Sequence, residues 1–76
     1  MQNRFQHRGV APSAATANAV RDLITEVGDW QTARFCGHTR LTVARVAARL
    51  PVNPTTIADI ESRLAARREA DRQHVG

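Results

Sequence analysis

The chain contains no lysine and no tyrosine, only one cysteine, and no long apolar run. One cysteine excludes an internal disulfide, and no Cys/His spacing is typical of a zinc site. No apolar run approaches the ~18 residues that span a membrane, and no signal-peptide core follows Met1. With 76 residues, the chain suits one domain and leaves little room for a deep catalytic cavity. These absences favour a small, basic, cytoplasmic domain.

All eleven basic residues are arginine, and thirteen residues are alanine. GC-rich codon usage explains this composition without any function, whereas arginine also suits phosphate and guanine recognition through its forked guanidinium group. The positions of the charges are more informative. Residues 29–54 contain four arginines and one aspartate, a net charge of +3, whereas residues 55–76 contain four charges of each sign. A local excess of positive charge is typical of a nucleic-acid-binding face.

Apolar periodicity, capping residues and glycines predict an all-α fold, a compact four-helix domain without a β-wing. After a flexible arm of residues 1–12, Ser13 is an N-cap and Gly28 a helix stop. Gly37 ends the second helix, and Pro51 disfavours continuation of the third. No segment alternates with period two. We expect helices at residues 13–27, 29–36, 39–50 and 54–72, within a domain of residues 13–73 that is followed by a frayed C-terminus at 74–76.

The residues around Gly37 have the pattern of two short helices that cross. Glycine permits positive φ, and a turn of this kind joins short helices at roughly 90–120°. Ala33 is small enough for the point of contact, and Cys36, Val43 and Val46 are apolar positions that hold the later helix against the earlier one. This pattern predicts a helix-turn-helix, although other helical hairpins also satisfy it.

Residues 33–46, with the sequence ARFCGHTRLTVARV, resemble the helix-turn-helix of lactose-repressor-type regulators. Residues 52–60 resemble the segment that opens the next helix of that family, so the resemblance covers about residues 29–65. It departs in three features: His38 replaces an apolar turn residue, the link between the helices is about one residue shorter, and the sequence has no sugar-binding domain. A helix before the motif is instead the order in phage Cro and repressor DNA-binding domains.

The resemblance implies a sequence-specific DNA-binding regulator whose helix at 39–50 enters the major groove. Arg40 and Arg45 match variable and base-reading positions of the family, and a guanidinium group can bind guanine through two hydrogen bonds. Simple solubility is the alternative role of both side chains. We expect base contacts from Thr39, Arg40, Leu41 and Arg45, and phosphate contacts from Gln31, Thr32, His38 and Arg49.

Other residues have two interpretations each. Trp30 either touches the DNA backbone or packs helix 29–36 against helix 13–27. Arg4 and Arg8 either reach an adjacent minor groove or belong to a disordered terminus. One module reads few bases, so we expect a homodimer on a palindromic operator. Ile57, Ile60 and Leu64 either form the dimer contacts or close the core of the monomer.

The predicted partner is double-stranded DNA, and the predicted role is that of a repressor or autoregulator of phage or prophage type, such as those of anti-CRISPR operons. It would act in the bacterial cytoplasm. The alternative is a protein-interaction module, such as a phage factor that binds host RNA polymerase, or an antitoxin, because fold does not fix function. An enzyme is not expected, since no nucleophile–base set or glycine-rich phosphate loop is present. We expect no cofactor, metal, small-molecule ligand or membrane contact.

Overall fold

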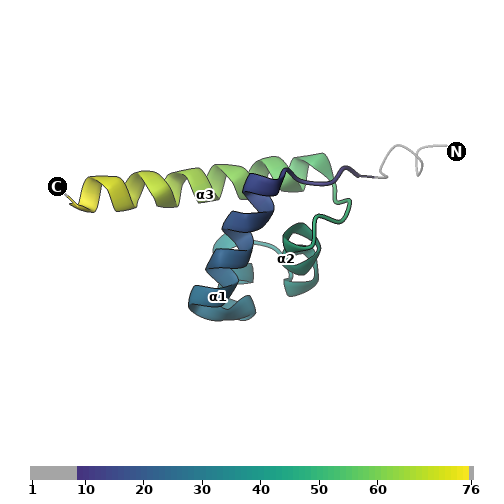
Figure 1. Ribbon diagram of the computed structural model, residues 1–76, viewed down its shortest axis with the longest axis horizontal. Helices are drawn as coiled ribbons and strands as arrows, with labels where there is room; N and C mark the ends of the chain where they lie inside the picture. The colour runs from purple at the N-terminus through teal and green to yellow at the C-terminus, as the bar shows by residue number, and fades with distance from the viewer. Residues whose placement is uncertain (1–8, 76) are drawn as a thin grey trace, which may run out of the picture.

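The computed structural model describes residues 9–75, with the backbone alone at residues 74 and 75. It contains α1 (Ala14–Cys36), α2 (Arg40–Ala47) and α3 (Pro54–Val75). The first part of α1 crosses α3, α2 lies below α3 beside α1, and α3 continues well beyond both (Figure 1). Within the described residues there is no strand, and no helix is long and apolar enough to cross a membrane. The all-α prediction is confirmed, whereas the predicted count of four helices is wrong.

The count differs because α1 joins the two helices that were predicted at 13–27 and 29–36. Its N-cap is Ser13, as predicted, whose hydroxyl accepts a hydrogen bond from the amide of Thr16 at 3.2 Å. Gly28 is the interruption within α1, with non-helical φ 91° and ψ 162°. The Thr32 hydroxyl donates to the Gly28 carbonyl at 2.7 Å and so satisfies an acceptor at the break. The helix therefore kinks at Gly28 and resumes at once.

The turn after α1 is formed as predicted. Gly37 has the left-handed backbone conformation, with φ 72° and ψ 27°. The amides of Gly37 and His38 donate to the carbonyls of Arg34 and Ala33 at 3.2 and 3.1 Å, which is the Schellman arrangement of a helix C-terminus. Thr39 then caps α2 through its side chain, which accepts from an amide in the first turn. The two caps hold α1 and α2 in a tight turn.

The second helix of the structure, α2, is shorter than the predicted helix of residues 39–50. It ends at Ala47, and Arg49 takes a positive φ of 59°, which breaks the helix before Pro51 is reached. The chain then runs beside the N-terminal segment, where Val52 and Val10 exchange two backbone hydrogen bonds of 2.9 and 3.0 Å. The sequence pattern did not predict that α2 ends at Ala47, because the segment after α2 is held by hydrogen bonds to the distant residue Val10.

Residues 9–12 belong to the folded domain, so the prediction of an arm over 1–12 is wrong for them. Besides the pairing of Val10, Pro12 is buried, and a Cβ atom on Gly9 would lie 2.7 Å from the Val52 carbonyl oxygen. Arg4 and Arg8 lie outside the described residues. At the other end, α3 continues to Val75, beyond the predicted end at residue 72 and into the segment predicted to fray.

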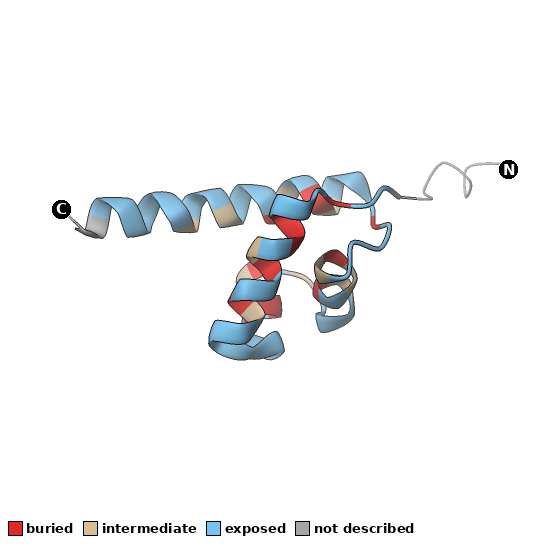
Figure 2. Cartoon of the chain, viewed as in Figure 1, coloured by how far each residue is buried: buried red, intermediate tan, exposed pale blue. Residues whose placement is uncertain are grey.

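All three helices contribute to one core. The predicted contacts Ala33, Cys36, Val43 and Val46 are all buried there. The core is formed by Val20, Ala33, Cys36, Val43, Val46, Val52, Ile57 and Ile60. The buried residues face inward between the helices, whereas the C-terminal half of α3 is mostly exposed (Figure 2).

The start of α3 closes this core. Ile57 and Ile60 are buried within it, and Leu64 packs against it. The prediction of Ile57 and Ile60 as dimer contacts is therefore wrong, because a side chain buried in the monomer has little surface left for a partner. Leu64 is only partly buried, and its role as a dimer contact stays a prediction. The alternative, in which this helix closes the core of the monomer, is confirmed.

Candidate nucleic-acid interface

One side of α2 packs on the core and the opposite side faces solvent. Val43 and Val46 are fully buried, and they fix the rotation of the helix about its axis. Leu41 is 70% exposed, the highest value among the large hydrophobic residues described, and the Arg40 side chain is 60% exposed. Both residues lie in the first turn of α2. Two of the four predicted base contacts are thus available to a partner.

Thr39, a third predicted base contact, is used inside the protein. Its hydroxyl accepts from the Thr42 amide at 3.1 Å and donates to the Thr42 hydroxyl at 3.0 Å. This capping role satisfies one of the amides that every helix leaves without an intrahelical partner. Thr39 therefore positions the start of α2, and we no longer expect it to contact a base.

Arg45, the fourth predicted base contact, is partly buried at the other end of α2. One Nη2 hydrogen bond of 2.8 Å joins it to the Pro51 carbonyl. A guanidinium group has five N–H donors, so this bond leaves most of them available. The bond also holds the side chain along the loop that follows α2, which limits its conformational freedom.

Two further arginines donate to backbone carbonyls around this same loop. Arg21 Nε donates to Ala47 O at 2.8 Å, and Arg49 Nε donates to Pro12 O at 3.1 Å. We call Arg21, Arg45 and Arg49 the carbonyl-bound arginines. A carbonyl neutralises no charge, so three positive charges gather near the C-terminal end of α2. The excess of positive charge in residues 29–54 predicted a basic surface that includes Arg45 and Arg49. Arg21 lies outside that range and joins them through its hydrogen bond to Ala47.

Of the predicted phosphate contacts, some are exposed and one is buried. Gln31 and Arg49 are exposed. Thr32 is fully buried and its hydroxyl is bonded to the Gly28 carbonyl, so its prediction as a phosphate contact is wrong.

His38 is bound to α3. Its Nε2 lies 2.9 Å from Asp59 Oδ2, and Arg63 Nε lies 3.4 Å from the same oxygen. The His38 hydrogen bond, together with the Arg63 guanidinium, lowers the pKa of Asp59 below its ordinary value. Arg63 also donates to Phe35 O at 3.3 Å. This cluster ties the turn to α3, so we no longer expect His38 to contact a phosphate.

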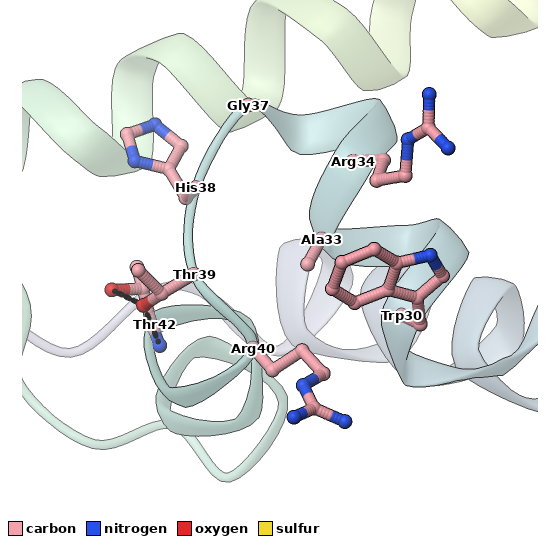
Figure 3. A pocket seen from close by; sticks show the side chains of 8 residues that line it. All are labelled: Trp30, Ala33, Arg34, Gly37, His38, Thr39, Arg40 and Thr42. Atoms are coloured by element: carbon pink, nitrogen blue, oxygen red, sulfur yellow. Dashed lines mark hydrogen bonds between the residues drawn. The ribbon is translucent and has the colours of Figure 1, made fainter.

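A solvent-open hollow of about 630 Å³ lies between the end of α1 and the start of α2. We call it the Trp30 hollow; its lining comes from Trp30, Ala33, Arg34, Gly37, His38, Thr39, Arg40 and Thr42. Trp30 and Arg40 lie on one side of it and His38 on the other (Figure 3). Trp30 is 56% exposed, so more than half of its surface is open to a partner. The Arg40 guanidinium carbon lies 5.7 Å from the centre of the indole ring.

Among residues 9–73, whose side chains the structure describes, no three His, Cys, Asp or Glu side chains are grouped closely enough to hold a metal ion. Cys36 is buried in the core, and burial raises the pKa of its thiol, which disfavours the reactive thiolate.

Comparisons of the chain with protein-family models, with curated proteins and with solved structures gave no match. The geometry of the described residues, together with the sequence pattern, therefore carries the functional conclusion.

Proposed function

We propose that the protein is a sequence-specific DNA-binding transcriptional regulator. In this proposal the segment from residue 29 to residue 47 acts as a helix-turn-helix, and α2 lies in the major groove with its N-terminal turn toward the bases. The resemblance of residues 33–46 to lactose-repressor-type regulators supports this assignment. Binding at a promoter would repress transcription by excluding RNA polymerase.

The observation that carries the proposal is the exposed side of α2. Val43 and Val46 are buried, and the side chains of Arg40 and Leu41 point away from the core at the end of the helix that would meet base edges. Arg40 and Arg45 can each bind a guanine, whereas Leu41 can pack on a thymine methyl group. The proposed base contacts are therefore Arg40, Leu41 and Arg45.

The second support is uncompensated charge. The carbonyl-bound arginines surround the C-terminal end of α2, and none of them forms an ion pair with a carboxylate of residues 9–75. Positive charge of this kind binds phosphates and provides the sequence-independent part of DNA affinity. Arg49 and Gln31 are the proposed phosphate contacts that remain from the sequence prediction.

Two copies on a palindromic operator remain the proposed mode of binding. A single eight-residue α2 reads too few base pairs for useful specificity, and a two-fold arrangement doubles the site. The contacts between the copies would not come from Ile57 or Ile60, which are buried in the monomer. An inverted repeat in the preferred DNA would establish the two-fold arrangement.

The proposal is tested by the salt dependence of binding to a labelled duplex, followed by fluorescence anisotropy. We expect the logarithm of the association constant to fall linearly with the logarithm of salt concentration, with a slope of about −0.9 for each phosphate contacted. A protein-interaction module without DNA affinity would give no anisotropy change at any salt concentration, with random or selected duplexes, and that result would remove the proposal.

A further inference from the structure

We infer that the Trp30 hollow holds one sugar–phosphate unit of the DNA backbone, with Trp30 and Arg34 as its principal contacts. This inference rests on the proposed function and extends it to a site on α1. From the sequence, a backbone contact was one of two interpretations of Trp30, Arg34 had no assigned role, and the phosphate contacts of this segment were assigned to Gln31 and Thr32. Thr32 is buried, whereas Trp30 and Arg34 are exposed and available to a partner.

The position of the hollow supports DNA as its occupant. Thr39, Arg40 and Thr42 from the start of α2 line one part of it, while Trp30 and Arg34 line another. Trp30 and Arg34 are four residues apart, so they share one face of the helix after the kink. When the first turn of α2 is in the major groove, this face lies over the edge of the groove, where a backbone strand runs.

The chemistry of the hollow fits a group with one apolar side and one negative charge. The exposed indole of Trp30 offers a flat apolar surface and an N–H donor, which suit a deoxyribose ring and a phosphate oxygen. Arg34 is exposed and forms no ion pair with a carboxylate of the described residues. Its guanidinium group can therefore bind phosphate without losing an internal partner.

Arg40 is held only weakly over the hollow in the free protein. Its Nη1 lies 4.0 Å from Asp29 Oδ2, and both side chains are more than half exposed. Exposed pairs of this kind contribute little, because water and salt screen them. Arg40 can thus leave the indole for a base edge, which opens the Trp30 ring to the backbone.

The experiment uses the natural fluorescence of the protein, because Trp30 is the one tryptophan of the chain and there is no tyrosine. Acrylamide quenching of Trp30 is measured in the free protein and in the presence of a saturating duplex of about 20 base pairs, with binding followed by the anisotropy of a labelled strand. We expect the quenching constant to fall when the duplex is bound. If the duplex binds and acrylamide reaches Trp30 as readily as before, the hollow faces away from DNA and the inference is wrong, while the proposed function stands.

A matched pair of variants tests the role of charge. Arg34→Ala is expected to weaken binding to selected and random duplexes alike and to reduce the salt slope by about 0.9. Arg68→Ala removes the same charge from an exposed position on α3 and should leave the slope unchanged. Equal effects of the two variants would overturn the inference, since they would reflect net charge alone. If the unmodified protein binds no duplex, the proposed function itself fails and this site fails with it.

Discussion

The carbonyl-bound arginines near α2 and two arginines of α3, Arg63 and Arg67, differ in their partners. Arg21, Arg45 and Arg49 donate to backbone carbonyls and keep their full charge. In α3, Arg63 lies 3.4 Å from Asp59, and Arg67 lies 3.1 Å from Glu26 and 3.9 Å from Asp71. The former keep an uncompensated charge, whereas the charges of the latter are paired. The Arg67–Glu26 pair and the hydrogen bond from Arg63 to Phe35 O tie α3 to α1.

This comparison bears on the two explanations for a chain in which every basic residue is arginine. Codon usage can supply arginine everywhere, but it does not decide which guanidinium group faces a carboxylate. The carbonyl-bound arginines combine structural hydrogen bonds with uncompensated charge, a combination that suits a surface that binds phosphates. Four predictions test how distinct the two regions are, beginning with the largest expected effect.

The first prediction concerns the role of α3 in the core. Ile60→Ala removes a fully buried side chain, so we expect the free energy of unfolding to fall by about 2–5 kcal/mol. Chemical denaturation followed by circular dichroism measures the loss. Leu41→Ala, at an exposed position, is the control and should change stability by no more than about 0.5 kcal/mol. A midpoint that rises steeply with protein concentration would instead place Ile60 in a dimer interface.

The second prediction concerns the turn between α1 and α2, which contacts α3 through His38 and Asp59. Gly37→Val places a β-branched residue at a φ of 72°, and its Cβ would lie 3.2 Å from the Arg63 guanidinium group. We expect a loss of about 2 kcal/mol, measured by thermal denaturation. Gly37→Asn, which tolerates the left-handed conformation better, should lose clearly less. Equal melting temperatures for the valine variant and the unmodified protein would show that this turn does not need positive φ.

The third prediction compares one arginine from each region. Arg49→Ala should weaken binding to all duplex sequences about equally and lower the salt slope by roughly one, because it removes one uncompensated charge. Arg67→Ala should leave the slope nearly unchanged, since Arg67 is paired with carboxylates. Anisotropy titrations at several salt concentrations measure both slopes. If Arg67→Ala lowers the slope as much as Arg49→Ala, the distinction between the two regions disappears.

The fourth and smallest effect is a pH dependence of stability. The hydrogen bond from His38, with the neighbouring Arg63, lowers the pKa of Asp59 in the folded protein. A lowered pKa means that the ionised carboxylate stabilises the fold above the unfolded pKa of about 3.9, and that this contribution disappears as the pH falls through the folded pKa. Asp59→Asn should therefore show a shallower loss of stability below about pH 4. Melting curves of the two proteins between pH 2 and pH 7 provide the comparison, and parallel pH profiles would contradict the assignment.

The parts of the fold that were predicted correctly depend on local chemistry. Ser13 caps α1 because its hydroxyl reaches an amide three residues later, and Gly37 ends α1 because only glycine adopts positive φ at low cost. The burial of Val43 and Val46 follows from their helical spacing beside that turn. Each of these features is encoded within a few neighbouring residues.

The parts that were missed depend on contacts between distant segments. Arg21 meets Ala47, His38 meets Asp59, and Val10 pairs with Val52 across separations of 26, 21 and 42 residues. These contacts tie His38 to Asp59 and bring residues 9–12 into the domain. Thr32 was misplaced because it is buried and its hydroxyl donates to the carbonyl four residues earlier. Spacing along the chain reports none of these arrangements.

The most direct test of the central claim is selection of bound duplexes from a random pool, carried out in parallel with the unmodified protein and Arg45→Ala. The proposed function predicts that the unmodified protein enriches a short motif arranged as an inverted repeat, and that Arg45→Ala binds DNA but loses preference at one position in each half-site. A pool that keeps its random composition after selection would contradict the claim, and so would an identical motif from both proteins.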